Sequence, residues 1–485
     1  MPREIELKLV LSQEKADAFV KSQEDKAKPI TRELHAIYFD TPEQALREAG
    51  FSLRIRRSGR KRIQTIKGIV PDASGLFARQ EWERTVRDDR PVLDESGPLC
   101  EVLRKAGVGP APMFDVTVER LTWVIEEEGT SIEMVVDRGM VMASDRQSPV
   151  CEIELELKAG NPNAIFSMAR KLGKEATLRL GVVSKAGRGY GLLGPARTAF
   201  KAEKVGLYEE ADAAHAFQAI AGECIRHYRL NEDLLLDDSD PEAVHQARVA
   251  LRRLRSAIAI FKPMLRGEAM KRFQGELRWL AGVLGDVRDL DVLLARTGPG
   301  EARDHMIRAR GQATEKLDEA IGSRRARNLM VDLTEWTLLG AWRAAPETEA
   351  IGALPADDFA ESALRKLRKR VKKRGADLSR LSDGERHEAR KAAKRLRYGV
   401  EFLAGLFPGK KSAGRFRKFS ASLEHLQDDL GELNDLVSAP QIFKRLGLIA
   451  QDDMLELPVN RRKSRILRDA QDAFADLMDK KTFWS

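Results

Sequence analysis

The stretches EIELKL, residues 4–9, and CEIELELK, residues 151–158, decide the fold of the first part of the chain. In each stretch an ionisable residue alternates with an apolar one. Because successive side chains of a β-strand point to opposite faces, one face of the first stretch carries Glu4, Glu6 and Lys8. Both stretches therefore predict strands with one apolar face and one face of charged groups.

Length and composition limit the classes of protein to consider. A chain of 485 residues with 42% hydrophobic residues is long enough for two or more domains with real cores. The net charge of +9 and the pI near 9.3 favour polyanionic partners, without distinguishing nucleic acid, phosphate polymer and anionic lipid. The first residues lack an apolar signal core and no long uncharged apolar run occurs, so we expect a soluble cytoplasmic protein. Three scattered cysteines predict neither a disulfide framework nor a thiolate metal site.

The texture of the sequence changes near residue 200. Before this point, β-branched runs alternate with turn signals, whereas almost everything after it has helical periodicity. We place the boundary in residues 192–213 and expect a strand domain, 1–200, and a linker, 201–212. An all-helical domain, 213–485, follows, with halves at about 213–345 and 356–480.

Other strand-like segments of the first part also group charges on one face. They contribute Arg54 and Arg56, Lys67, Arg79 with Glu81 and Glu83, Arg120, and Glu133 with Asp137. For any single strand, a solvated face of an antiparallel sheet is the simpler interpretation. Like charges stacked on one strand repel each other, however, and carboxylates that hold Mg²⁺ beside arginines that hold phosphate would relieve this repulsion. About eight antiparallel strands closed into a barrel would direct all these groups into one lumen, with helices at 12–22 and 161–173 over the apolar outer faces.

Eight motifs, in order, carry a family resemblance. They are ExExK at 4–8, YFDT at 38–41, LRIR at 53–56, IKG at 66–68, RQEWE at 79–83, EMVVDRG at 133–139, EIELELK at 152–158 and SK at 184–185. Over roughly residues 1–200 the chain resembles the CYTH domain of the triphosphate tunnel metalloenzymes. The resemblance implies an eight-stranded tunnel in which acidic residues hold Mg²⁺ or Mn²⁺ and basic residues hold a triphosphate.

The resemblance also implies roles for individual positions. The metal ligands it implies are Glu4, Glu6, Glu154 and Glu156, with Asp137, Glu81 and Glu83 serving a second ion. The phosphate-binding positions are Lys8, Arg54, Arg56, Lys67, Arg79, Arg120 and Lys185. Catalysis is expected from Glu4, Glu6, Lys8, Lys67 and Glu83. The group that accepts the proton of the attacking water stays open among a metal-bound hydroxide, Glu83 and Lys67.

The second part of the chain contains an internal duplication. VHQARVALRRLR, 244–255, corresponds to RHEARKAAKRLR, 386–397, and the segment 272–290 corresponds to 418–436. Phe273 pairs with Phe419, Leu277 with Leu423, Leu284 with Leu430, Gly285 with Gly431, and Asp289 with Asp435. This duplication predicts two similar helical bundles related by a pseudo-twofold axis and separated near 345–357.

Within each repeat, a basic stripe follows helical spacing. The first stripe is His245, Arg248, Arg252 and Arg255, and the second is His387, Arg390, Lys394 and Arg397. For one isolated stripe a solvated helix face is the simpler interpretation, but its recurrence favours an anionic ligand. These residues resemble the CHAD domain, a conserved-histidine α-helical domain with a basic channel that is associated with inorganic polyphosphate. Nucleic acid competes with this interpretation, yet only Tyr398 adjoins a stripe as an aromatic for base stacking, so we favour polyphosphate.

Together the two parts predict an inorganic triphosphatase whose helical domain binds polyphosphate and either raises the local substrate concentration or directs the enzyme to polyphosphate-rich sites such as granules. One alternative is a nucleoside or thiamine triphosphatase, or an adenylate cyclase of the CYTH type. Another is a non-catalytic polyphosphate-binding adaptor whose tunnel is a sensor. No P-loop or other nucleotide motif is present, and no membrane partner is expected.

Overall fold

A computed structural model describes residues 5–68, 76–77, 81–127, 129–207, 210–445 and 459–484, with backbone alone at 76–77, 435–445 and 459–462. The chain packs into two compact units. The strand unit comprises Met1–Lys201, Ile225–Ala243 and Ile321–Gly340, and the helical unit comprises Ala202–Cys224, Val244–Ala320 and Ala341–Ser485. Packing thus assigns two segments of the helical region to the strand unit. The domain boundary predicted from the sequence stays a prediction.

The strand unit is built on one antiparallel sheet. Its strands are β1 (Ile5–Leu11), β2 (Ile30–Asp40), β3 (Phe51–Ser58), β4 (Lys61–Gly68), β5 (Leu76–Phe77), β6 (Glu81–Thr85), β7 (Ala111–Glu127), β8 (Thr130–Ala143), β9 (Arg146–Ala159) and β10 (Leu178–Leu180). The order is β10-β1-β9-β8-β7-β2-β3-β4-β6, and β5 pairs with β1. Eight of the described strands have five or more residues, whereas β5 and β10 have two and three. This is the antiparallel fold class expected from the alternation.

The sheet curves around an interior. Along the chain β5 lies between β4 and β6, yet it pairs with β1 near the opposite end of the strand order, which brings the two ends of the sheet together. Helices α1 (Gln13–Glu24) and α4 (Asn163–Glu175) begin and end within two residues of the predicted ranges and bury apolar side chains such as Phe19 and Phe166. The apolar faces of β1 and β9, with Leu7 and Leu155 fully buried, therefore form part of the core as expected.

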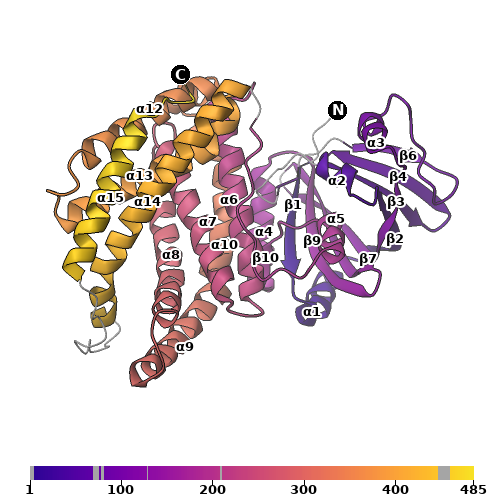
Figure 1. Cartoon of the computed structure of the whole chain (residues 1–485). Coiled ribbons are helices and arrows are strands. Elements are labelled where there is room, and N and C mark those ends of the chain that lie inside the picture. The colour runs from indigo at the N-terminus through magenta and orange to yellow at the C-terminus, as the bar shows by residue number, and fades with distance from the viewer. Residues whose placement is uncertain are drawn as a thin grey trace. The chain divides into compact units, whose positions relative to one another are not determined.

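A short helix fills one end of the interior. Helix α5 (Lys185–Leu193) packs beside β7, β8 and β9, as Figure 1 shows. Its Tyr190 joins a buried apolar cluster with Tyr38 and Phe114. The inner face of the sheet is apolar around α5 and charged farther along. Helix α5 therefore closes the apolar end of the interior, and its first residue, Lys185, lies at the charged cavity. Two further helices, α2 (Ala45–Glu48) and α3 (Cys100–Ala106), cover another apolar cluster around Leu53 and Ile55.

The region after residue 212 is all helical in its described residues. Its helices are α6 (Ala213–Leu235), α7 (Pro241–Ile260), α8 (Glu268–Leu294), α9 (Glu301–Gly322), α10 (Arg324–Leu339), α11 (Pro346–Gly352), α12 (Ala356–Gly375), α13 (Asp383–Leu403), α14 (Lys410–Arg445) and α15 (Val459–Asp479). The repeated segments fall on α7 and α13 and on α8 and α14. Both repeats bury the same apolar positions: Phe273 and Phe419 are 1% and 0% exposed.

Two observations concern the expected class of protein. Within the described residues, no helix combines the length and the apolar character needed to cross a bilayer. Cys100, Cys151 and Cys224 are all free thiols, as the cysteine count predicts.

Candidate functional site

A charged cavity of about 310 Å³ lies inside the curved sheet. Its basic wall residues are Lys8, Arg54, Arg56, Lys67, Arg120, Lys158 and Lys185. Its acidic wall residues are Glu6, Glu81, Glu83, Glu133, Glu154 and Glu156. They come from β1, β3, β4, β6, β7, β8, β9 and α5, so strands far apart in the sequence contribute to one site.

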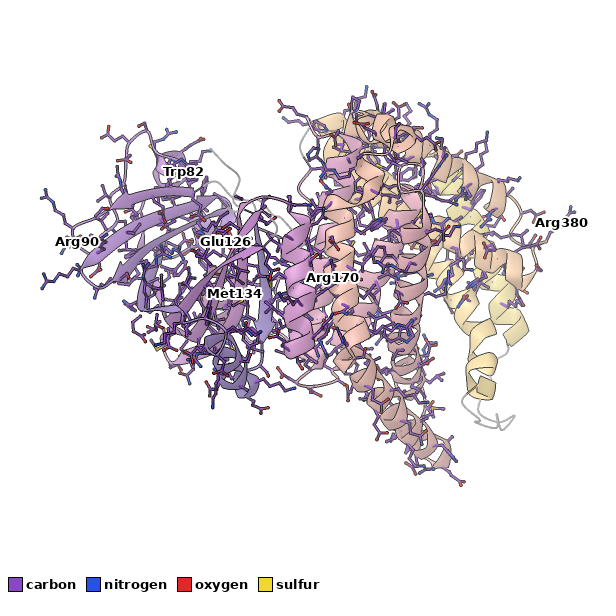
Figure 2. All side chains as sticks on the ribbon, turned by 180° about the vertical axis from the view of Figure 1, so that it is seen from behind. Trp82, Arg90, Glu126, Met134, Arg170 and Arg380 are labelled. Carbon is purple, nitrogen blue, oxygen red and sulfur yellow. The ribbon has the colours of Figure 1, made fainter. Side chains whose placement is uncertain are left out.

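The strand register explains why these residues meet. On β1 and β9, Glu6 lies opposite Glu156 and Lys8 lies opposite Glu154. On the next strand, Glu133 lies opposite Glu156 as well. Because facing residues of paired strands share one side of the sheet, a single alternation places all of them on the inner face. Trp82, labelled in Figure 2, alternates with Glu81 and Glu83 on β6 and is absent from the cavity wall.

Three carboxylates and three cations form the innermost part of the site. Asp137, Glu152 and Glu154 place carboxylate oxygens within 4.8 Å of one another. Lys185 Nζ lies 2.6 Å from Asp137 Oδ2 and 2.9 Å from Glu154 Oε1, and Lys8 Nζ lies 2.8 Å from Glu152 Oε1. Arg120 donates to both oxygens of Asp137, at 2.7 and 2.6 Å, and to Glu154 Oε2 at 2.9 Å.

These ion pairs fix the protonation states of the cluster. Burial opposes ionisation of Glu154, but Lys185, Lys8 and Arg120 hold the pKa of its carboxyl well below its usual range. Burial likewise opposes the charge on Lys185, yet Asp137, Glu152 and Glu154 raise its pKa well above its ordinary value. Glu6, nearer the cavity, has its pKa raised by burial and by the neighbouring Glu154. The carboxyls of Asp137 and Glu154, both with lowered pKa values, are thus ionised at neutral pH beside the charged Lys185 and Arg120.

Two arginines of β3 differ from these paired cations. Arg54 Nη1 lies 3.4 Å from the Tyr38 hydroxyl, and its buried Nε has no hydrogen-bond partner among the described residues. Arg56 makes no ion pair or hydrogen bond within the described part of the chain. Its pKa is lowered by burial and by the neighbouring guanidinium groups of Arg54 and Arg120. Two adjacent guanidinium groups without a carboxylate partner form a site for an anion.

Most of the remaining charged residues of the wall form ion pairs with one another. Lys67 forms an ion pair with Glu81, and Glu83 Oε1 accepts a hydrogen bond from Thr65 Oγ1 at 3.0 Å. Lys158 Nζ lies 2.6 Å from Glu156 and 3.4 Å from Glu133. Predicted metal ligands and predicted phosphate ligands are therefore in contact at several points, and opposite charges hold each other in place.

A divalent cation fits the donors that the structure brings together. Hard cations bind carboxylate oxygens, and the buried Glu152 Oε2 has no hydrogen-bond partner among the described residues. Asp137, Glu152 and Glu154 form a buried acidic cluster of the kind that holds a metal. Three of the carboxylates in the cavity wall are cross-strand neighbours: Glu6 of β1, Glu156 of β9 and Glu133 of β8.

Most of the predicted residues converge on this cavity, with two exceptions. Glu4 and Arg79 lie outside the described residues. Sequence reasoning gave no role to Glu152, Tyr38 or Lys158, all of which contact or line the site. Glu152 and Lys158 belong to the same alternation as Glu154 and Glu156, so the register contained the signal. Nothing in the local pattern around Tyr38 indicates its contact with Arg54.

The two basic stripes of the helical unit also converge. Arg252 Nε of α7 donates to the Tyr398 hydroxyl of α13 at 2.7 Å, which joins the two repeats. Lys394 of α13 lies within the electrostatic influence of Arg248 and Arg252 as well as of Arg390 and Arg397. Within the described residues, Arg252, Arg255, Lys394 and Arg397 form no ion pair with a carboxylate.

In each repeat, a glycine of the next long helix lies beside an arginine of the basic stripe. A Cβ atom at Gly285 would lie 2.5 Å from Arg248 Nη1, and one at Gly431 would lie 3.7 Å from Arg390 Nη2. Arg248 also lies 3.6 Å from Asp289. The histidines differ from the arginines, because His387 is exposed and its Nδ1 lies 2.8 Å from Asn434 Oδ1. The other ring nitrogen of His387 therefore faces away from that contact.

The chain thus combines a curved sheet around a cavity of carboxylates and basic residues with a duplicated helical region whose repeats share a basic cluster. The family model described as the CYTH domain matches residues 2–190, and the one described as the CHAD domain matches residues 219–444. The chain therefore consists of a CYTH domain followed by a CHAD domain.

Individual relatives are more distant. An inorganic triphosphatase of Haemophilus influenzae is 31% identical over 166 residues, which is 32% of this chain and 45% of that protein. The chain thus matches less than half the length of this relative. The CHAD domain of Ricinus communis is 30% identical and covers 59% of this chain and 98% of its own, with a TM-score of 0.46. A proposed adenylyl cyclase from Hippeastrum with a dominant triphosphatase activity is 18% identical over 39% of this chain and 95% of its own, with a TM-score of 0.29.

Proposed function

We propose that the CYTH domain is a metal-dependent inorganic triphosphatase that hydrolyses triphosphate to pyrophosphate and phosphate, and that the CHAD domain binds inorganic polyphosphate. One observation carries the first proposal. Half-buried Arg54 and Arg56 form no ion pair with a carboxylate among the described residues and line one wall of a cavity whose other walls include the carboxylates of β1, β8 and β9. A ligand that is anionic toward the arginines and carries a cation toward the carboxylates satisfies both walls.

The chemistry of phosphoanhydride hydrolysis assigns a task to each group. Its transition state spreads negative charge over the transferred phosphoryl group, so fixed positive charges supply most of the acceleration. Arg54 and Arg56 would bind phosphate oxygens, while Lys185 and Arg120 keep the carboxylates of Asp137 and Glu154 ionised. Mg²⁺ or Mn²⁺ held by the carboxylates would neutralise further phosphate oxygens and acidify a bound water. Glu83 is exposed at the wall and could take up the proton of that water.

The cavity wall favours an inorganic substrate over a nucleotide or thiamine triphosphate. Among the described residues that line it, the one aromatic side chain is Tyr38, which is 4% exposed and stacks on Phe114 with ring centroids 4.8 Å apart. Trp82 alternates to the other face of β6. Because the Tyr38 ring is already stacked on Phe114, the described part of the wall offers no free aromatic face for a base. The similarity to a protein named inorganic triphosphatase supports the same substrate.

A comparison of neighbouring arginines tests the triphosphatase. Phosphate release is measured from triphosphate, ATP and thiamine triphosphate with Mg²⁺ or Mn²⁺. Arg56→Met should lower kcat/KM for triphosphate by about 100- to 1000-fold, the usual loss for a donor to the transition state. Arg57→Met is the matched control, because Arg57 pairs with Asp89 instead of lining the cavity.

Three outcomes would change the proposal. Faster turnover of ATP or thiamine triphosphate than of triphosphate would make the enzyme an organic triphosphatase. Conversion of ATP to a cyclic product would make it a cyclase. If the wild type releases no phosphate from any substrate with either metal, the non-catalytic adaptor is the remaining function.

The polyphosphate proposal rests on the basic cluster shared by α7 and α13. Its four cations without carboxylate partners, Arg252, Arg255, Lys394 and Arg397, suit a linear polyanion whose charges repeat along its length. Competition between long-chain polyphosphate and RNA for the full-length protein, repeated at several salt concentrations, tests this preference. Tighter binding of RNA at every salt concentration would favour a nucleic-acid function.

A further inference from the structure

The strand that borders the catalytic strand β1 is held by helices of the CHAD region. Strand β10 pairs with β1, with Leu180 opposite Leu9. Within the strand unit, Arg229 of α6 donates from Nε to the Leu180 carbonyl oxygen at 2.8 Å. Arg179 of the same strand donates to the carbonyl oxygen of Ile321, at the end of α9, at 2.9 Å. The last two residues of this short strand therefore bond to groups from the segments 225–243 and 321–340.

Arg229 is built into a buried polar network. Its side chain is fully buried, and it forms ion pairs with Glu232 and with Asp233, the latter at 2.5 Å. Glu232, 1% exposed, also accepts a hydrogen bond from Tyr228 at 3.1 Å. A buried guanidinium group that is held by two carboxylates has little freedom to move. The Leu180 carbonyl is thus attached to a rigid point on α6.

The residues that follow Leu180 lead directly into the cavity. The Gly181 amide donates to the Lys8 carbonyl oxygen at 2.8 Å, and a Cβ atom at this position would lie 2.8 Å from Lys8 Cγ. Ser184 then caps α5 by accepting from the Gly187 amide at 3.0 Å. Lys185, the next residue, contacts Asp137, Glu152 and Glu154.

We infer that Arg229 is a positioning residue for the triphosphate cavity, because its bond to the Leu180 carbonyl fixes residues 180–185 and so places Lys185 against the inner carboxylates. The inference rests on the proposed triphosphatase function for its kinetic consequence. Its structural part stands independently. A segment of the CHAD region would thereby complete the active site of the CYTH domain.

The test removes the anchor together with its buried partner Glu232, while Arg179, which lies 3.5 Å from Glu232, retains its bond to the Ile321 carbonyl oxygen. In Arg229→Met combined with Glu232→Met, both members of the buried pair are apolar, which is a well-tolerated way to lose an ion pair. Arg170→Met is the matched control. Arg170, labelled in Figure 2, lies on α4 and joins Glu335 of α10 at 2.7 Å and Asp332 at 3.2 Å, away from residues 180–185. Arg229→Lys keeps the charge and tests for partial rescue.

Two measurements separate positioning from folding. Amide hydrogen exchange of the full-length protein should become at least 10-fold faster at Gly181 and Gly187 in the double variant and stay unchanged in Arg170→Met. In kinetics with triphosphate, the double variant should raise KM at least 10-fold and move the acid limb of the kcat/KM profile to higher pH, because carboxylates without Lys185 bind protons more readily. Arg229→Lys should recover part of both effects.

Each outcome bears on a different statement. Unchanged exchange at Gly181 in a folded double variant would overturn the anchor. Faster exchange with wild-type KM and an unchanged acid limb would overturn the positioning role. A wild type without triphosphatase activity would refute the proposed function instead, and the exchange data would still decide whether Arg229 holds the segment.

Discussion

Lys394 gives the basic cluster of the CHAD domain a specific pH dependence. Burial and the charges of Arg252, Arg390, Arg248 and Arg397 lower its pKa from an ordinary value of 10.5 to about 7. Arg248 and Arg252 come from α7, and the others share α13. The residue of α14 that contacts this turn is neutral, since Gln427 donates to the Ala393 carbonyl oxygen at 3.4 Å. No carboxylate pairs with Lys394 in the described part of the chain.

A bound polyanion restores the charge on Lys394, so its binding takes up a proton. The pKa of the bound state is higher than that of the free state. The affinity is therefore complete below the free pKa and declines as the pH rises above it. With a free pKa of about 7 and a bound pKa near the ordinary value, affinity should fall about 30-fold between pH 6 and pH 8.5. This corresponds to about 2 kcal/mol of binding free energy. At pH 7, about half a proton should be taken up per molecule bound.

The assay is titration with long-chain polyphosphate at constant ionic strength across this pH range. Calorimetry in two buffers with different ionisation enthalpies measures the proton uptake directly. Lys394→Arg keeps a charge at every pH and should abolish most of the slope while retaining affinity at pH 8.5. Lys394→Met should bind with the same weakened affinity at both ends of the range. If Lys394→Arg retains the wild-type slope and proton uptake, the pH dependence comes from another group, such as His245 or His387, and the reasoning is wrong.

Three further predictions follow from packing and charge. Lys185, Lys8 and Arg120 lower the pKa of Glu154, so this carboxylate stabilises the fold above its ordinary pKa and loses that contribution as the pH falls through the lowered value. Calorimetry should therefore show a steep loss of stability below about pH 4, and the loss should be shallower in Glu154→Gln. Gly285→Ala should displace Arg248 and weaken polyphosphate binding at least threefold. Gly431→Ala should leave binding unchanged and gain about 0.5–1 kcal/mol of helix stability. Equal binding by both variants would contradict a role of Gly285 in positioning Arg248. Phe273→Ala and Phe419→Ala should each cost about 3–5 kcal/mol in denaturant unfolding, and a large difference between them would contradict equivalent packing in the two repeats.

Local patterns predicted the parts of this protein that repeat at short range. Alternation along β1 and β9 identified which side chains share the inner face, and the register of the sheet places Glu6, Lys8, Glu154 and Glu156 there. The stripes of α7 and α13 were equally legible, because a spacing of three and four residues fixes one face of a helix. The apolar residues on the opposite faces of these helices are buried, for example Leu251 and Leu396, which are both 0% exposed.

The sequence did not predict which charged residues form ion pairs across the fold. The family resemblance implied that Lys8 and Lys185 bind phosphate, but in the structure both contact Glu152 and Glu154, whereas Arg54 and Arg56 form no ion pair with a carboxylate among the described residues. Which lysine meets which carboxylate depends on strand order and on the position of α5, and neither is encoded within a few residues of the charged group.

The amino-acid sequence alone determined the inner and outer faces of the strands and the duplicated basic stripes, because these follow from a spacing of two or of three to four residues, and its motifs carried the resemblance to the two domain families. Only the tertiary structure decided that Arg229 reaches the Leu180 carbonyl and that Arg252 meets Tyr398. Such contacts join residues about 50 and 146 positions apart, and their energy depends on burial and distance that exist only once the chain has folded.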